Sequence, residues 1–188
     1  MDRILISATS LVTEADVSTA RLGKRFGRLD LASQLVLLAV EKLSIDFDVW
    51  SRDRIGICLA AQAGSLATDF EYWRGRDLVG GPSPTLFAYT LPSAAIGEVA
   101  IRHRLTGPNL CVVGEDNLLI EARDWLQRAE VDACLGIFCT VITPAIAEMI
   151  QAAPIARAGA VFLQRGNQGQ GGRELRQNDR DIAALCTG

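Results

Sequence analysis

The sequence predicts a layered α/β domain built around a largely parallel sheet. Apolar runs of strand length alternate along the chain with stretches of helical length, and this alternation is typical of α/β layers. The chain has 188 residues, the usual size of one domain whose core needs no disulfide or metal to hold it. Hydrophobic residues make up 49% of the chain, as in ordinary globular proteins.

Five apolar runs have the length and composition of strands. The run at 55–60 is continuously apolar, which favours a strand covered on both faces. The run at 110–113 is short and follows the Gly107-Pro108 turn. We therefore expect strands at residues 3–8, 55–60, 110–113, 133–141 and 158–164.

Four helices are expected beside these strands. The clearest covers residues 28–43, where Leu31, Leu35 and Leu38 recur at helical spacing. The others are expected at 65–73, 93–104 and 117–129, while the segment 11–23 is polar and irregular. Four glycines lie among polar residues between 166 and 172, a composition typical of flexible segments. We therefore expect a folded domain over residues 1–165 and a flexible polar tail over 166–188.

Composition and charge exclude several function classes. The net charge of −3 gives no strong field for nucleic acid or a membrane surface, and no apolar run reaches membrane-spanning length. The five cysteines form no CxxC pair and the chain has one histidine, so we expect reduced thiols, no metal site and no cofactor. No secretory pattern precedes the first strand, and these features together predict a cytoplasmic protein.

Several segments, taken in chain order, resemble the N-terminal half of the β-ketoacyl synthases, a family of the thiolase-like superfamily. The most informative of them contains Gly-Pro-Asn, a short apolar strand and then a helix start, as does the strand that carries the family nucleophile. The resemblance spans roughly residues 3–165 and implies a three-layer α/β/α half with a five-stranded mixed sheet. The segments that carry it are Lys24–Ala32, Asp53–Ile57, Ser83–Gly97, Gly107–Asp116, Val131–Gly136 and Ala158–Leu163.

The sequence departs from this family at the positions of the catalytic residues. Asp116 occupies the position of the nucleophilic cysteine, and the family's catalytic histidines belong to a C-terminal half that this sequence lacks. The acidic-glycine signature of the family is also missing from 144–158. Condensation needs a thiolate to carry the acyl chain and histidines for decarboxylation and the oxyanion. We therefore expect no catalytic residue in this chain.

The resemblance implies a non-catalytic accessory subunit of a fatty-acid or polyketide synthase, of the chain-length-factor type, aryl-polyene pathways included. Such a subunit pairs with a full-length ketosynthase, or with itself, through the nucleophile strand. The residues expected there are Leu110, Cys111, Val112 and Val113. An acyl carrier protein is a further expected partner, through basic residues that include Arg102 and Arg104; nucleic acid and membrane are not.

The residue pattern of the predicted helix 117–129 favours an N-terminal half of the synthase fold over a complete synthase. Leu118, Ala122, Trp125, Leu126 and Ala129 form one apolar stripe, with charged residues on the other side. In a full synthase this helix lies between two sheets and is apolar nearly all round. A charged face indicates contact with water or a polar partner, in agreement with loss of the second sheet.

The titratable residues near this frame have alternative interpretations. Asp116 at a helix start favours capping over acid-base catalysis, because carboxylates accept from the free N–H groups there. His103 shares a stripe with Ile96 and Val99 and fits a partly buried, hydrogen-bonded residue better than a base. Cys111 on the strand is expected to be buried and unreactive.

Two other functions remain open. One is a small stand-alone enzyme acting on acyl-thioesters with Asp116, Glu115 or His103 in its site. The other is a homodimeric scaffold that binds carrier protein. The arginines that would recruit an acidic carrier are Arg25, Arg28, Arg102 and Arg104, although surface arginines are usually solvated or paired with nearby acids.

Overall fold

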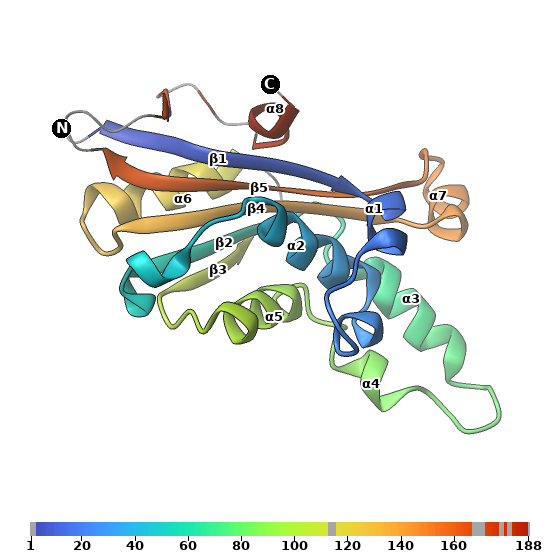
Figure 1. Ribbon diagram of the computed structural model, residues 1–188. Coiled ribbons are helices and arrows are strands. Elements are labelled where there is room, and N and C mark those ends of the chain that lie inside the picture. Colours follow the sequence, from blue (N-terminus) through green and yellow to red (C-terminus); the bar gives the residue numbers. More distant parts are fainter. Residues whose placement is uncertain (1–2, 113–115, 167–171, 177–178, 180–181, 188) are drawn as a thin grey trace.

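The computed structural model describes residues 3–112, 116–166, 172–176, 179 and 182–187. A long, twisted sheet crosses the molecule, and helices cover both of its faces (Figure 1). The strands are β1 (Arg3–Thr13), β2 (Ile55–Ala61), β3 (Asn109–Val112), β4 (Ala133–Ile142), β5 (Ile155–Gly166) and β6 (Arg173–Glu174). The α-helices are α1 (Glu14–Thr19), α2 (Leu31–Lys42), α3 (Leu66–Gly75), α4 (Pro84–Phe87), α5 (Ala94–His103), α6 (Asp116–Gln127), α7 (Pro144–Ile150) and α8 (Ile182–Thr187), and short 3₁₀ turns lie at Phe26–Arg28, Phe47–Val49 and Arg52–Arg54.

The sheet is mixed and its strands run in the order β3-β2-β4-β5-β1-β6. Strand β2 is parallel to both β3 and β4, whereas β5 is antiparallel to β4 and β1. The expected three layers are confirmed, but the sheet has six strands rather than five. The sixth, β6, is a two-residue polar strand that pairs with Leu5 and Ile6 of β1, and no apolar pattern marks it in the sequence.

One face of the sheet packs against α2 and α5. Leu35, Val36 and Val99 from these helices are fully buried against Ile57 and Leu59 of β2. Helix α2 begins at Leu31 because the Asp30 side chain caps it, accepting from the N–H of Ser33 at 3.0 Å, as short carboxylates do at helix starts. This layer forms the larger of two apolar cores.

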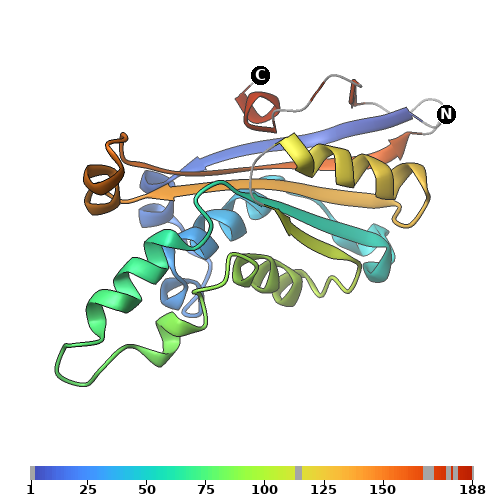
Figure 2. The same cartoon turned by 180° about the vertical axis from the view of Figure 1, so that it is seen from behind.

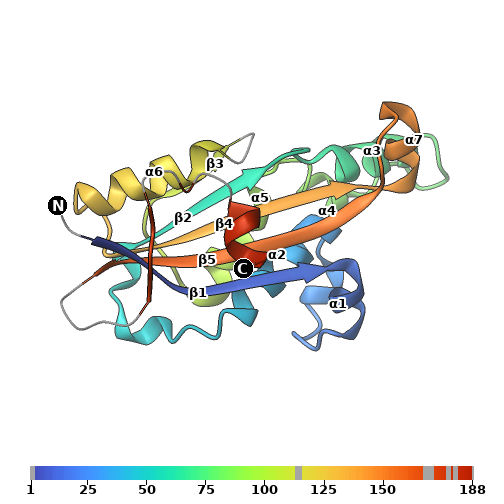
Figure 3. The same cartoon turned by 90° about the horizontal axis from the view of Figure 1, so that it is seen from above.

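The opposite face packs against α6 and α8, and in Figure 3 α6 runs roughly along the strands while the short α8 lies near β5 and β1. The apolar side of α6 places Leu118, Leu119, Ala122 and Leu126 in the core with no exposed surface, while Asp124, Gln127 and Arg128 are exposed. The amphipathic pattern expected for this helix is therefore present, with Leu119 buried as well and Ala129 exposed beyond the last turn.

Two segments differ from the sequence expectation. Strand β1 extends to Thr13, because residues 8–13 pair with β5 and the Ser10 hydroxyl donates to the Ala39 carbonyl at 2.6 Å. Within 166–188, expected to be a flexible polar tail, the described residues form β6 and α8. Ile182 and Leu185 are buried against the sheet, so this short apolar stretch is a packing element of the domain.

Candidate functional site

Strand β3 forms one edge of the sheet and is the first element of the candidate site. It pairs with β2 on one side, and in the described part of the chain no strand pairs with its other side. Leu110, Cys111 and Val112 are each partly exposed. Val113, the fourth residue expected here, lies outside the described residues. An exposed edge strand is a template for a strand from another chain.

The register of β3 shows which backbone groups are available to a partner. The N–H of Ile57 donates to the carbonyl of Pro108 at 2.9 Å, and Ile57 is aligned with Asn109. Because backbone groups of a parallel strand alternate in direction, the N–H and C=O groups of Asn109 and Cys111 point away from β2. The outer edge therefore offers the backbone donor and acceptor of both residues.

The side chains of β3 divide between the two faces. Cys111 packs against the core under α2 and α5, whereas Leu110 and Val112 pack against the core under α6. Burial raises the pKa of the Cys111 thiol, so the reactive thiolate is scarce near neutral pH. Strand β3 can thus contribute backbone hydrogen-bonding groups to a site, and its side chains are neutral.

Asp116 is the first residue of α6, directly after the segment that follows β3. The helix expected over residues 117–129 is therefore present and begins at Asp116. The side chain of Asp116 and the whole of Glu115 lie outside the described residues, so their contacts are not part of the site geometry.

His103 lies in the other helical layer. Its ring packs 4.8 Å from the ring of Phe47, and its Nε2 is 3.6 Å from Glu41 Oε1, with no hydrogen-bond partner among the described residues. Burial lowers the pKa of His103, although Glu41 opposes this effect. Because α5 and α6 cover opposite faces of the sheet (Figure 2), His103 and the Asp116 backbone do not meet in one site.

A groove with basic residues runs beside α2 and α5. It consists of two adjoining hollows of about 500 and 220 Å³ that share Leu22 and Phe26 as their apolar floor. Arg21 and Lys24 line the larger hollow, and neither has an acidic partner among the described residues. Arg28 and Arg104, at two further exposed positions, likewise have none within the described ranges.

Two of the arginines identified in the sequence are already paired. Arg25 donates two hydrogen bonds of 3.0 Å to the buried Glu98 carboxylate, which also accepts from the Tyr89 hydroxyl at 3.2 Å. Arg102 forms an ion pair with Glu41. Arg25 and Arg102 therefore fix α5 against its neighbours. The role of Glu98 was not expected from the sequence, although Glu98 is a lone acid within the apolar stretch 94–101.

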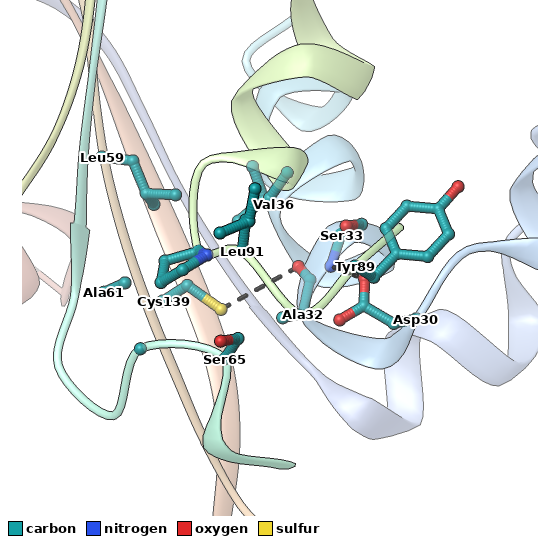
Figure 4. A pocket seen from close by; sticks show the side chains of 13 residues that line it. Asp30, Ala32, Ser33, Val36, Leu59, Ala61, Ser65, Tyr89, Leu91 and Cys139 are labelled. Atoms are coloured by element: carbon teal, nitrogen blue, oxygen red, sulfur yellow. Dashed lines mark hydrogen bonds between the residues drawn. The ribbon is translucent and has the colours of Figure 1, made fainter. Parts of the chain in front are cut away.

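A narrow pocket lies where β2 and β4 end, next to the start of α2 (Figure 4). Asp30 is engaged there, since its carboxylate also accepts from the Thr68 hydroxyl at 2.6 Å. Cys139 faces the Ala32 carbonyl at 3.9 Å, and burial raises the pKa of this thiol to about 12. The pocket holds about 10 Å³, room for roughly one water molecule. It offers neither space for a substrate nor an activated nucleophile.

Metal and membrane chemistry find no support in the described part of the chain. No group of three or more potential metal ligands is present among the described residues. Within the same residues, no helix is both long enough and apolar enough to pass through a bilayer.

Comparison with known proteins identifies the fold. No family model matches the sequence, and no curated protein matches it. Solved structures do match. The ishigamide ketosynthase/chain length factor superposes with a TM-score of 0.73 at 19% identity, covering 89% of this chain and 63% of that one.

Two further structures have the same architecture. The complex of the ketosynthase ApeO with its chain length factor ApeC from Xenorhabdus doucetiae gives a TM-score of 0.64 at 18% identity, covering 88% of this chain and 80% of that one. The complex AntDE:AntF, a type II PKS acyl-carrier protein with its ketosynthase bound to the hexaketide, gives 0.75 at 11% identity, covering 88% and 63%.

The chain has the thiolase-like fold of the ketosynthases and chain length factors. It spans 63% of the length of the ishigamide protein. The similarity extends over nearly nine-tenths of this chain, so it covers both helical layers and the strands between them. The fold implied by the sequence resemblance is thereby confirmed.

Proposed function

We propose that this chain is a non-catalytic accessory subunit, of the chain-length-factor type, of a fatty-acid or polyketide β-ketoacyl synthase, with aryl-polyene pathways included. One observation carries the proposal: in a thiolase-like fold, the helix after β3 begins with Asp116, where the sequence resemblance expects the family's cysteine, and no described strand pairs with the outer edge of β3. Chain length factors occur in the solved complexes that share its architecture.

The chemistry of the described side chains supports a non-catalytic role. Burial raises the pKa of the Cys111 and Cys139 thiols, and a thiol hydrogen bond and burial raise that of Cys134. The chain's one histidine, His103, is enclosed in the opposite layer from α6. A condensation reaction would need a thiolate and imidazoles facing one acyl group.

The open edge of β3 supports pairing with a competent ketosynthase. Strand addition there would satisfy the outward groups of Asn109 and Cys111 without rearranging the sheet. No charged side chain lies on the strand, so nothing on it repels an incoming strand. A second copy of this chain could occupy the same edge, and that homodimer is the alternative the test must distinguish.

The basic groove supports a carrier-protein contact. The apolar floor of Leu22 and Phe26 beside Arg21 and Lys24 suits an acidic helix with an apolar anchor. Such binding would weaken as salt rises, because exposed charges are screened within about 8 Å at physiological ionic strength. We also place this chain in the cytoplasm, in keeping with cysteines that form no disulfide among the described residues.

The decisive experiment is co-expression of the tagged chain with complete ketosynthases of its own genome. We expect one of them to co-purify at equal stoichiometry and to make longer or more uniform chains with the subunit than without it. A chain that purifies alone as a homodimer would favour the scaffold alternative. Acyl transfer by the chain alone, lost in an Asp116→Asn variant, would favour the small-enzyme alternative.

A further inference from the structure

Three polar side chains form a row across the sheet, at the end where β2 and β4 terminate. Gln62 directly follows β2, Thr140 lies near the end of β4, and Arg157 lies near the start of β5. The three strands are neighbours in the order β2-β4-β5, and Thr140 is aligned with Arg157. Directly opposed residues of antiparallel strands place their side chains next to each other on one face. We call these three residues the polar row.

The polar row lies on the face of the sheet that α6 and α8 cover. The Arg157 guanidinium lies 5.6 Å from the centre of the Phe138 ring, and Phe138 belongs to the core under these two helices. Thr140 follows Phe138 by two residues and therefore points to the same side of β4. The carboxyl ends of parallel strands, where the row lies, are common ligand-binding positions in open α/β sheets.

Arg157 carries a positive charge that no acid pairs with in the described part of the chain. Its Nε is buried and has no hydrogen-bond partner among the described residues. Thr13 of β1 is aligned with Arg157, but its hydroxyl donates to Asp16, whose carboxylate also accepts from Lys42. A buried N–H without an acceptor costs free energy. An acceptor from outside the chain would therefore be stabilised at Arg157.

The other two members of the polar row add a second donor. Thr140 is buried, and its hydroxyl donates to Gln62 Oε1 at 3.2 Å. Because this bond engages the carbonyl oxygen of the Gln62 amide, the NH₂ group of the amide remains available to donate. Gln62 is exposed, so solvent reaches this group. The row thus offers a guanidinium and an amide donor, and none of its three side chains is acidic.

The charge and shape of these donors indicate the class of ligand. A guanidinium presents parallel N–H groups that match the two oxygens of a carboxylate. The row contains one cation, which balances the single negative charge of a carboxylate. A phosphate dianion would keep an uncompensated charge on this partly buried surface, which is unfavourable.

We propose that the polar row of Gln62, Thr140 and Arg157 is a binding site for a carboxylate. Arg157 pairs with the carboxylate, and its contact with the Phe138 ring holds the guanidinium in place. Gln62 donates to the same ligand, and the Thr140 hydroxyl sets the orientation of the Gln62 amide. The site is independent of the proposed function, because it requires neither the β3 edge nor a ketosynthase.

The test is an NMR titration of the purified chain with sodium acetate. We expect saturable shifts of the backbone amides of Thr140 and Arg157, and sodium chloride at equal ionic strength corrects for general salt effects. Arg157→Gln removes the charge, and we expect it to raise the dissociation constant for acetate at least about tenfold. Circular dichroism checks that the variant folds.

Two further variants make this test specific. Arg173→Gln is the matched control, because it makes the same change of charge at an exposed position of β6, outside the polar row. We expect it to bind acetate within about twofold of wild type. Gln62→Ala changes an exposed side chain and should raise the dissociation constant about threefold. Should Arg157→Gln fail to fold, the Gln62→Ala variant decides.

The possible results have distinct meanings. Weaker acetate binding by Arg157→Gln and Gln62→Ala, with Arg173→Gln unchanged, supports the site. Equal binding by wild type and the folded row variants overturns it, as do wild-type shifts that acetate and chloride produce alike. Tighter binding of inorganic phosphate than of acetate at the same amides would overturn the assignment to a carboxylate. The proposed function stands or falls separately, by co-purification with a ketosynthase.

Discussion

The two edges of the sheet differ in a way that indicates where a partner binds. The β3 edge carries neutral residues and has no neighbour among the described strands. At the other edge, β6 adds a short polar strand to β1, and Arg3 forms an ion pair with Glu174 at 2.7 Å. Charged side chains and very short edge strands prevent unwanted strand pairing. The comparison favours β3 as the edge that another chain extends.

The most severe test of binding at the β3 edge is to remove one of its outward-pointing backbone N–H groups. We expect Cys111→Pro to weaken the complex with the ketosynthase about a hundredfold or more, because proline removes the N–H that points away from β2. The domain should still fold, since proline is tolerated where an edge strand faces solvent. Calorimetry measures the affinity and circular dichroism the fold.

Two controls isolate the backbone effect of that variant. Cys111→Ser keeps the N–H and should bind within about threefold of wild type. Arg173→Pro alters the opposite edge and should leave the affinity unchanged. Equal binding by the Cys111→Pro and Cys111→Ser variants would show that β3 does not pair with the partner.

The second prediction concerns how firmly the β1 side is closed. Gly159 of β5 lies beneath α8, and a Cβ atom there would clash with Phe138 and approach Cys186 Sγ to 2.9 Å. We expect Gly159→Ala to lower the free energy of unfolding by about 2–3 kcal/mol, as overpacked cores do. Urea unfolding measures the loss.

Gly97→Ala provides the matched control, because Gly97 lies in α5 and its Cβ would meet no atom within 4 Å. A helical alanine should stabilise the chain by up to about 1 kcal/mol. A Gly159→Ala variant as stable as wild type would indicate that α8 lifts readily from the sheet, which would leave the β1 side open as well.

Much of the fold that produces this contrast between the two sheet edges could be predicted from the sequence. The short elements and several contacts could not, for physical reasons. The long strands and helices were expected because the apolar residues of segments such as 28–43 and 55–60 recur with a clear period. The short elements α1, α4, α7 and β6 were not, because two to seven residues carry no period and depend on tertiary contacts. The basic groove was only partly foreseen.

The roles of single residues could likewise be predicted only where they depend on neighbours in the sequence. The spacing from Gly107 placed Asp116 at a helix start, because that relation is local in sequence. The pairing of Arg25 with Glu98 joins residues 73 positions apart, and nothing local specifies it. The exposure of the large apolar side chains between residues 66 and 91 also depends on where the rest of the chain lies, and no local pattern specifies it.

The third prediction concerns the ion-pair cluster that ties β2 to its neighbours. Asp132 accepts hydrogen bonds from Arg54 at 3.0 and 3.2 Å and also pairs with Arg165. Arg54 in addition donates to the carbonyls of Ala129 and Glu130 after α6, both at 2.8 Å. Because Arg54 directly precedes β2, this cluster fixes the strand that supports the β3 edge.

We expect Asp132→Asn to lower the free energy of unfolding by about 1 kcal/mol at pH 7, a value reduced for partial solvent exposure. Hydrogen bonding from Arg54 lowers the pKa of Asp132 below its ordinary value of 3.8. The contribution is therefore complete above the unfolded-state pKa and is lost as pH falls through the lower folded-state pKa. Urea unfolding at pH 7 and at acid pH should show wild type and variant converging, and a constant difference would assign the effect to packing.

The smallest expected effect tests what closes the β1 edge. Arg3 and Glu174 are 67% and 48% exposed, and such surface pairs contribute at most about 0.5–1 kcal/mol. We therefore expect Arg3→Ala to change the free energy of unfolding by less than about 0.5 kcal/mol. Light scattering should also show an unchanged oligomeric state, because β6 still pairs with Leu5 and Ile6 through its backbone. Glu174→Ala removes the same pair from the other side and should behave alike.

If either variant gained a dimer that Cys111→Pro does not prevent, the β1 edge would be kept closed by one ion pair. Both edges would then be competent for pairing, and β3 would differ from β1 only in the charge of a single side chain.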